Sequence, residues 1–223
     1  MNTASILTQQ APVTSADISI REKINAMIDD TISSLPAAEK LSSEERHGII
    51  ARYSAVLEGN FIYWMTAAYM SVKAEEARPI ILENLYEEVR DAHPTMLRKF
   101  TMAAHAYPTE QDALAVHENL TKMRAFLGRL SGVQSVLTMA FFEGFIQRFM
   151  GPLAELAAAQ GSTEMEYTDV HGVCDIEHTE GLFTALSMEM AISPVGSDKD
   201  LFEGVDLLRA LIGDIVFNQA LAA

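Results

Sequence analysis

Helix start and stop signals recur along the whole chain, and no segment alternates apolar and polar residues as a strand would. Prolines stand near the first turns of several apolar segments, where the missing N–H of proline costs nothing. Ser42 and Glu45 have the spacing of a capping box, in which each side chain accepts a hydrogen bond from the other residue's backbone N–H. These signals favour an all-α fold.

The signals divide the chain into seven or eight helices in one compact domain. The expected helices cover residues 18–35, 42–72, 80–90, 95–106, 110–130, 131–150, 167–183 and 198–221. The helix over 131–150 is expected to be interrupted near Gly151 and Pro152, because proline cannot donate the hydrogen bond that a helix interior needs. Residues 1–16 are expected to form a flexible tail, and residues 17–223 the helical domain.

The composition restricts the partners of this domain. Of the 223 residues, 49% are apolar and 21% are charged, which is typical of a globular chain that buries a core. The net charge is −15, and the 16 Lys and Arg residues form no cluster that would attract nucleic acid or an anionic membrane. We therefore expect neither nucleic acid nor a membrane as a partner.

Targeting signals are also missing from the sequence. The N-terminal residues lack the basic and then apolar segments of a secretory signal, and no run of about 20 apolar residues occurs. The single cysteine excludes a disulfide framework within the chain and is compatible with a reducing compartment. The expected location is the cytoplasm.

The strongest chemical signal lies in YTDVHGVCDIEHTEGLF, residues 167–183. His171, Asp175 and His178 stand at i, i+4 and i+7, so they share one narrow face of a helix. Aspartate and neutral histidine are ligands for iron, zinc or manganese. A solvated polar stripe is the alternative interpretation of this face. Cys174 lies within one turn of both histidines and is interpreted as a small core residue.

A second signal is Glu143 in the apolar segment VLTMAFFEGFIQRFM. It stands in line with Val136 and Ala140 on a helix, where an ionised carboxylate is costly unless it is paired or binds a metal. The alternatives to metal binding are an ion pair with Arg148 or another basic residue, and a helix face that differs from the one assigned here.

A third signal is the pair of Glu88 and His93 in NLYEEVRDAHPTMLRKF. Five residues separate the two, so they would converge only if the helix breaks at residues 90–92 and a new helix begins at Pro94. Taken alone, this segment is better explained as an exposed acidic helix end followed by an N-terminal histidine.

Together, these residues resemble the ligand set of the haem-oxygenase-like diiron oxidases and oxygenases, also called the iron-containing redox enzyme family. The resemblance covers roughly residues 53–186 and rests on NLYEE, AHPTMLRKF, a Glu in an apolar helix and H-x-x-x-D-x-x-H, in this order. It implies a bundle related to haem oxygenase, without haem, in which two Fe(II) ions activate O2. The family's metal ligands would then fall on six residues: Glu88, His93, Glu143, His171, Asp175 and His178.

One departure from the family leaves the first ligand open. The segment between the Glu of YEE and the next His is usually longer and rich in glycine, whereas only VRDA separates Glu88 from His93 here. Glu87 and Glu88 are therefore both candidates, and we prefer Glu88.

Glu58, in the mostly apolar segment YSAVLEGNFIYWMTAAYM, is a further candidate metal ligand. N-oxygenating relatives have an additional Glu ligand from an early helix. Two ferrous ions carry four positive charges, so three carboxylates leave an excess of one that a fourth would neutralise. The alternative is a glutamate at the edge of a buried face.

The resemblance implies a non-haem diiron oxygenase or oxidase that acts on a small amine- or amino-acid-like substrate, by N-oxygenation or oxidative C–C cleavage, in specialised-metabolite biosynthesis. Arg90, Arg98 and Arg148 are candidates to anchor an acidic substrate. The alternatives are a thiaminase-like hydrolase that uses Cys174, and a non-catalytic metal-binding or interaction module. Because folds of this kind usually form homodimers, a homodimer is expected by analogy.

Overall fold

A computed structural model describes residues 15–193 and 197–217, and these residues form helices and no strand. This confirms the predicted all-α class. The helices are α1 (Ser15–Ser33), the short 3-10 helix η1 (Ala38–Lys40), α2 (Ser43–Leu57), α3 (Phe61–Ser71), α4 (Arg78–Arg90), α5 (His93–Ala103), α6 (Glu110–Leu127), α7 (Gly132–Ala159), α8 (Glu166–Ile192) and α9 (Asp198–Phe217). Residues 1–14 of the expected tail and 218–221 of the expected last helix lie outside the described residues, while residues 15 and 16 belong to α1.

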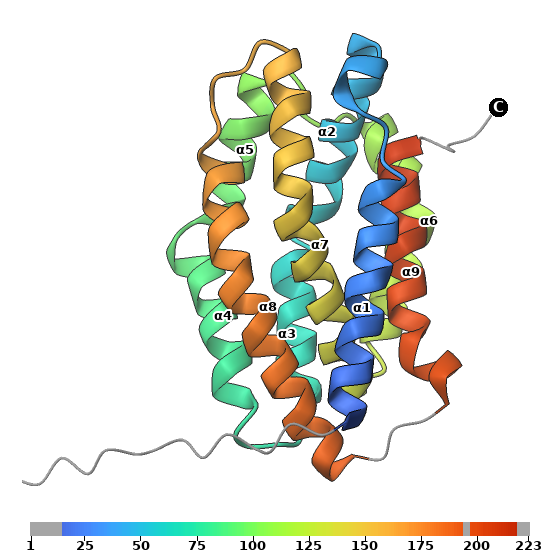
Figure 1. Cartoon of the computed structure of the whole chain (residues 1–223). Coiled ribbons are helices and arrows are strands. Elements are labelled where there is room, and N and C mark those ends of the chain that lie inside the picture. Colours follow the sequence, from blue (N-terminus) through green and yellow to red (C-terminus); the bar gives the residue numbers. More distant parts are fainter. Residues whose placement is uncertain (1–14, 194–196, 218–223) are drawn as a thin grey trace, which may run out of the picture.

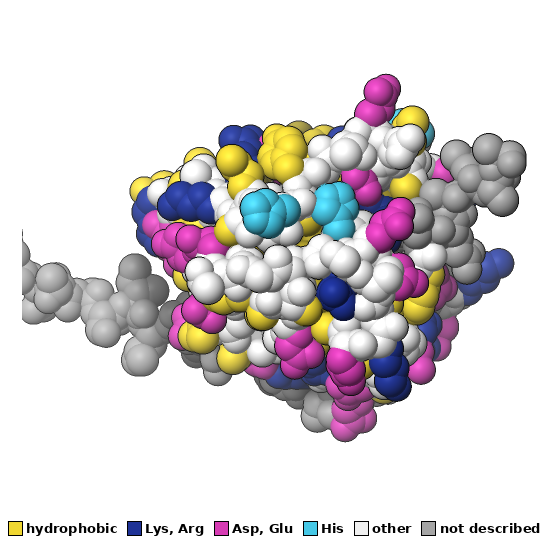
Figure 2. Space-filling model, turned by 90° about the horizontal axis from the view of Figure 1, so that it is seen from above, with side chains coloured by type: hydrophobic (Ala, Val, Ile, Leu, Met, Phe, Trp, Pro, Cys, Tyr) yellow, Lys and Arg dark blue, Asp and Glu magenta, His cyan; other side chains and the backbone are white. Residues whose placement is uncertain are grey.

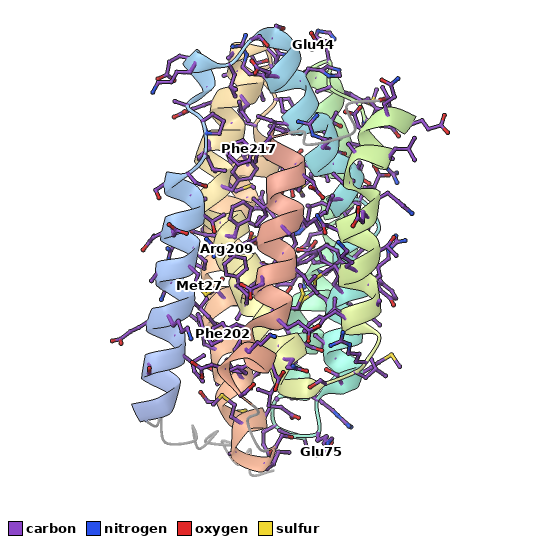
Figure 3. All side chains as sticks on the ribbon, turned by 90° about the vertical axis from the view of Figure 1, so that its right-hand side faces the viewer. Met27, Glu44, Glu75, Phe202, Arg209 and Phe217 are labelled. Carbon is purple, nitrogen blue, oxygen red and sulfur yellow. The ribbon has the colours of Figure 1, made fainter. Side chains whose placement is uncertain are left out.

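The helices form one bundle in which the long α7 runs through the middle (Figure 1). α7 is apolar nearly all round, and such a helix is stable in water only when neighbours cover every side of it. Helices α1, α2, α3, α8 and α9 pack against it, and the contact with α8 is the most extensive. On another side of the bundle α9 lies between α1 and α6, and its Arg209 forms an ion pair with Asp30 of α1 (Figure 3).

The expected single helix over residues 42–72 is wrong, because the structure divides it into α2 and α3. Gly59 separates the two helices with a φ of +82°, a conformation that glycine adopts without the steric cost of a side chain. Asn60 then donates a hydrogen bond from Nδ2 to the carbonyl oxygen of Val56, 2.8 Å away. The apolar pattern continues through the turn and therefore concealed it. The capping box of Ser42 and Glu45 is present as predicted.

The expected interruption near Gly151 and Pro152 is also wrong, since α7 continues through both residues to Ala159. A proline clashes with the Cβ of the residue before it when that residue is helical, and Gly151 has no Cβ. On either side of the proline, Phe149 and Leu153 are buried in the core. Their packing holds the helix together across the missing hydrogen bond.

The expected break between residues 90 and 93 is present. α4 ends at Arg90 and α5 begins at His93, and Ala92 between them adopts a left-handed conformation with a φ of +57°. The chain therefore changes direction within two residues, which brings the end of α4 and the start of α5 together. No helix among the described residues is long and apolar enough to cross a membrane.

We predict that Gly59→Ala lowers the free energy of unfolding by about 1–2 kcal/mol, because an L-residue is strained at this φ. No atom lies within 4 Å of the position of the added Cβ, so the effect isolates the backbone conformation. Urea denaturation monitored by circular dichroism measures it. The matched control is Gly213→Ala in α9, which also meets no atom but is helical, and it should stabilise by about 0.5–1 kcal/mol. Equal effects in the two variants would contradict the prediction.

Candidate metal centre

The six predicted metal ligands come from four helices and are all buried. α4 carries Glu88, α5 begins with His93, α7 carries Glu143, and α8 carries the other three. α8 contacts α4, α5 and α7, so these helices surround one region of the interior. The face of α8 that was predicted from the i, i+4, i+7 spacing is thus turned inward and is not a solvated stripe.

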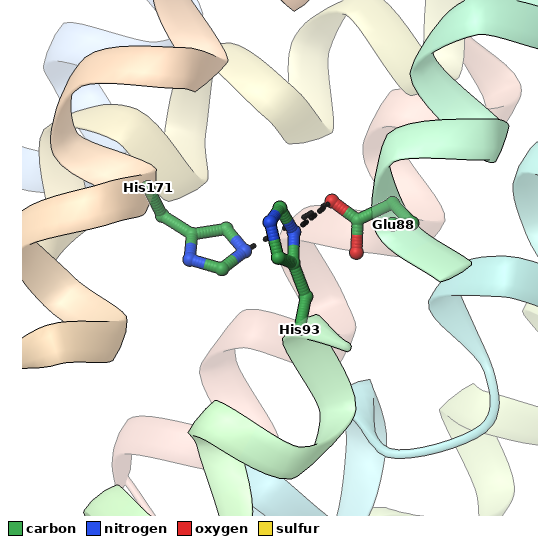
Figure 4. Close-up of side chains that lie close together, drawn as sticks. All are labelled: Glu88, His93 and His171. Atoms are coloured by element: carbon green, nitrogen blue, oxygen red, sulfur yellow. Dashed lines mark hydrogen bonds and ion pairs between the residues drawn. The ribbon is translucent and has the colours of Figure 1, made fainter. Parts of the chain in front are cut away.

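Glu88, His93 and His171 form one group, here called the Glu88 cluster (Figure 4). His93 Nδ1 lies 2.7 Å from Glu88 Oε1, and His171 Nε2 lies 3.9 Å from the same oxygen. The two imidazole rings pack edge to face with centroids 4.5 Å apart. One ligand atom from each residue lies within 4.8 Å of the other two, which is close enough for all three to bind one cation.

Glu143, Asp175 and His178 form a second group, here called the Asp175 cluster. His178 Nδ1 lies 3.6 Å from Asp175 Oδ1 and 3.9 Å from Glu143 Oε1. Cys174 is next to this cluster, and its Sγ donates a hydrogen bond to Asp175 Oδ1 at 3.3 Å. His171 and Asp175 stand one helical turn apart on α8, so the two clusters adjoin.

Three polar atoms of the Asp175 cluster are buried without a hydrogen-bond partner among the described residues. They are Glu143 Oε2, Asp175 Oδ2 and His178 Nδ1. An unpaired buried polar atom costs about 1–3 kcal/mol, and more when it is charged. A cation bound among Glu143, Asp175 and His178 would give these side chains a partner. This donor set of imidazole and carboxylate therefore fits a metal such as iron, for which both ligand types are suitable.

The pKa values in the metal-free chain reflect the same excess of buried negative charge. Burial raises the pKa of Glu143 well above its usual range, and the neighbouring Asp175 raises it further. Burial lowers the pKa of His171. Burial also lowers the pKa of His178, but the nearby carboxylates of Asp175, Glu143 and Glu87 outweigh it and raise the pKa to about 10. These shifts favour the protonated forms of Glu143 and His178 when no cation is bound.

A small pocket adjoins both clusters, with a volume of about 20 Å³ for water-sized molecules. It reaches Glu88, His93, Glu143, His171 and Asp175, and its remaining walls are mostly apolar. The apolar lining comes from Leu57, Phe61, Ile62, Pro94, Leu97 and Ile146. The interior thus offers a small, mostly apolar space beside the ligand residues.

The structure adds residues that sequence reasoning missed. Asn84 Nδ2 donates a hydrogen bond to Glu143 Oε1 at 2.8 Å, and the Tyr167 carbonyl oxygen accepts one from His171 Nδ1 at 2.8 Å. The Tyr167 hydroxyl also lies 2.8 Å from that of Tyr53, and both tyrosines are buried. Asn84 precedes Glu88 by four residues and Tyr167 precedes His171 by four. Each of these residues therefore stands one helical turn before a predicted ligand on the same helix, and this spacing was the signal in the sequence that could have identified them.

The two candidate glutamates of YEE contact different clusters. Glu88 belongs to the Glu88 cluster, as preferred, whereas Glu87 Oε2 accepts a hydrogen bond from His178 Nε2 at 2.9 Å. The assignment of Glu88 as a ligand stays a prediction.

Glu58 lies outside both clusters. It follows the last residue of α2, is partly exposed, and forms an ion pair with Arg98 at 2.5 Å. Its role as a metal ligand stays a prediction.

The arginines considered as substrate anchors are all engaged elsewhere. Arg98 pairs with Glu58, and Arg90 pairs with Asp91 at 2.6 Å. Arg148 donates to Asn25 Oδ1 at 2.7 Å and also pairs with Asp29, on α1. Arg148 therefore does not compensate Glu143, and the basic residue near that buried carboxylate is His178, with Nδ1 3.9 Å from Glu143 Oε1.

Histidines also occur at the end of the bundle that Figure 2 shows from above. His47 and His105 line an open depression together with Glu44. Among the described residues they do not belong to a group of three ligand atoms close enough to bind an ion. Glu44 and His47 lie in the first turn of α2, where an acidic residue stabilises the helix N-terminus.

The fold and the two clusters define a haem-oxygenase-like helical bundle with a buried carboxylate and histidine centre suited to metal. The sequence model of the iron-containing redox enzyme family matches residues 50–209, which include all six predicted ligands. The chain belongs to this family, as the resemblance predicted. A comparison with curated proteins finds no match.

The pKa of His178 leads to a prediction for the metal-free chain. A histidine whose pKa is raised on folding stabilises the fold fully below its unfolded pKa of about 6.5, and this contribution is lost as the pH rises through about 10. With a chelator present, we expect the free energy of unfolding to fall by more than about 1 kcal/mol across this window. Urea denaturation at a series of pH values measures it.

The fall should be smaller in His178→Gln, because the contribution from the raised pKa of His178 is then absent. His117→Gln on α6, which changes an exposed histidine, serves as the control and should keep the fall of the wild type. An identical pH dependence in His178→Gln and in the wild type would contradict the prediction.

Proposed function

We propose that the chain is a non-haem diiron oxygenase or oxidase that activates O2 to oxidise a small amine- or amino-acid-like substrate. The observation that carries the proposal is the pair of adjoining buried clusters, because six ligand residues are more than one ion can use while leaving room for O2. Membership of the iron-containing redox enzyme family supports iron as the metal.

The residues of the two clusters would hold one ion each. Glu88, His93 and His171 would bind the first, and Glu143, Asp175 and His178 the second. When bound, two ferrous ions supply the electrons and the open positions that reduction of O2 requires.

The surrounding side chains orient these ligands and keep water away. Asn84 holds one oxygen of Glu143, and the Tyr167 carbonyl oxygen holds Nδ1 of His171 so that Nε2 faces Glu88. Leu57, Phe61 and other apolar side chains line the pocket beside the clusters. A dry pocket limits the loss of reactive species to water and strengthens the electrostatic interactions within it.

The charge of the loaded centre supports an anionic substrate group. The three carboxylates of the clusters leave one positive charge of two ferrous ions uncompensated. Either Glu58 or a substrate carboxylate would supply the missing negative charge, and an amino acid carries both a carboxylate and an amine. Product analysis after incubation with ferrous iron, O2 and a panel of amino acids tests this substrate class and separates N-oxygenation from C–C cleavage. We place this reaction in specialised-metabolite biosynthesis.

The geometry around Cys174 does not favour a thiaminase-like hydrolase. A nucleophilic cysteine needs a lowered pKa, which an adjacent positive charge or a helix N-terminus provides. Burial and the carboxylate of Asp175 instead raise the pKa of Cys174 far above its usual range. No observation therefore supports thiol chemistry over metal chemistry at this position.

We predict that anaerobic ferrous titration of the chain saturates at roughly two irons, one for each cluster. His171→Ala and His178→Ala should each abolish iron-dependent O2 consumption, because each removes a nitrogen ligand from one cluster. An oxygen electrode measures the activity, and circular dichroism measures the retained helices.

The matched control for these two variants is His117→Ala, which removes an exposed imidazole on α6 and should retain full activity. Saturation at one iron, or full activity in either cluster variant, would remove the basis of the diiron proposal.

We predict a more selective effect for Glu58→Gln, which keeps the size of the side chain and removes its charge. Ferrous iron should bind nearly as in the wild type, because the six residues of the clusters are unchanged. Turnover should fall, because the oxidised centre carries more positive charge and depends more on a fourth carboxylate. Stopped-flow absorption after mixing with O2, together with product formation, measures the change.

Arg98→Gln controls for the loss of the Glu58–Arg98 ion pair, since it breaks the same pair and leaves the carboxylate in place. If Glu58→Gln gives the same traces and turnover as the wild type, Glu58 lies outside the working centre.

A further inference from the structure

The two nitrogens of His178 have different surroundings. Nε2 lies 2.9 Å from Glu87 Oε2, whereas Nδ1 is buried without a hydrogen-bond partner among the described residues. Nδ1 is also the nitrogen on the side of the cluster, 3.6 Å from Asp175 Oδ1 and 3.9 Å from Glu143 Oε1. A histidine that binds a metal through one nitrogen carries its proton on the other. The hydrogen bond to Glu87 therefore selects Nδ1 as the ligand atom.

His171, two turns earlier on α8, has the opposite arrangement. Its Nδ1 donates to the backbone carbonyl oxygen of Tyr167, and its Nε2 faces Glu88. The two histidines thus present different nitrogens to their clusters. A neutral backbone carbonyl group accepts the hydrogen bond from His171, and the carboxylate of Glu87 accepts the one from His178. A carboxylate partner makes an imidazole a stronger ligand, so His178 depends more on a single side chain than His171 does.

Glu87 is placed for this role and not for direct binding in the Asp175 cluster. Successive residues of a helix point about 100° apart, so Glu87 turns toward α8 while its neighbour Glu88 enters the Glu88 cluster. The side chain of Glu87 is 32% exposed, and its Oε1 lies 3.9 Å from Arg90 Nη2 near the surface. It contacts His178 through Nε2, the nitrogen that does not face Asp175 and Glu143.

We infer that Glu87 is a positioning residue that fixes His178 with Nε2 protonated and Nδ1 directed at the second metal ion. This role rests on the two-metal centre of the proposed function and assigns different tasks to the adjacent glutamates of YEE. Glu88 is a ligand of one cluster, and Glu87 orients a ligand of the other. The expected consequence is local, because Glu87 contacts only one of the two clusters.

A first experiment reads the nitrogen directly, with Zn²⁺ as a diamagnetic probe in place of iron. Two-bond ¹H–¹⁵N spectra of the zinc-loaded, ¹⁵N-histidine-labelled chain distinguish a metal-bound from a protonated imidazole nitrogen, and His178→Gln assigns the signal. We expect Nδ1 of His178 to be bound to zinc and Nε2 to carry the proton. Zinc on Nε2 would overturn the inference.

A second experiment measures zinc affinity by competition with a chelator in Glu87 variants. Glu87→Ala should weaken one of two zinc ions by about 10–100-fold and leave the other unchanged. Glu87→Gln retains an oxygen acceptor without charge and should show a smaller loss. Glu83→Gln, an exposed glutamate one turn earlier on α4, is the matched control and should bind zinc as the wild type does.

The outcomes separate this inference from the proposed function. Wild-type affinity for both ions in Glu87→Ala, or equal weakening of both, would overturn the positioning role even if iron-dependent O2 consumption is normal. Local weakening of one ion, with Nδ1 bound in the wild type, would support the role even if no oxidation of a substrate is found.

Discussion

Burial of carboxylates between α7, α8 and α4 is the constraint on which the rest of the centre depends. Glu143 and Asp175 are fully buried, and Glu88 nearly so. His93 pairs with Glu88, and His178 lies near Asp175 and Glu143, yet one oxygen each of Glu143 and Asp175 has no hydrogen-bond partner among the described residues. The packing of the bundle therefore maintains an arrangement that is unfavourable by itself and becomes favourable when a cation binds.

The parts of the site that the sequence predicted are those set by spacing within one element. His171, Asp175 and His178 share a face because an α-helix repeats every 3.6 residues, and no other element is needed to place them together. The break between α4 and α5 could also be predicted, because Glu88 and His93 meet only across it. Proline after His93 marked the start of the new helix.

The parts that were missed depend on contacts between elements or on backbone conformation. The contact of Asn84 with Glu143, and that of the candidate ligand Glu87 with His178, arise because α4 lies against α7 and α8, and the pattern of a single helix does not contain that information. The turn at Gly59 interrupts a segment whose apolar spacing continues on both sides. At Gly151 and Pro152 the sequence predicted an interruption, but α7 continues. Gly151 has no Cβ to clash with the proline, and the neighbouring residues pack in the core.

The turn at Gly59 connects the fold to the shape of the pocket. Leu57 ends α2 and Phe61 begins α3, and both line the pocket beside the Glu88 cluster. Glu58, between them, points instead to Arg98 on α5, the helix that begins with His93. One short segment thus supplies apolar walls to the centre and holds a carboxylate at its edge. The pocket beside this segment has about 20 Å³ available to water-sized molecules, which is room for about one of them. The Glu58–Arg98 pair joins the segment to α5, so the turn at Gly59 is connected to the helix whose first residue belongs to the Glu88 cluster.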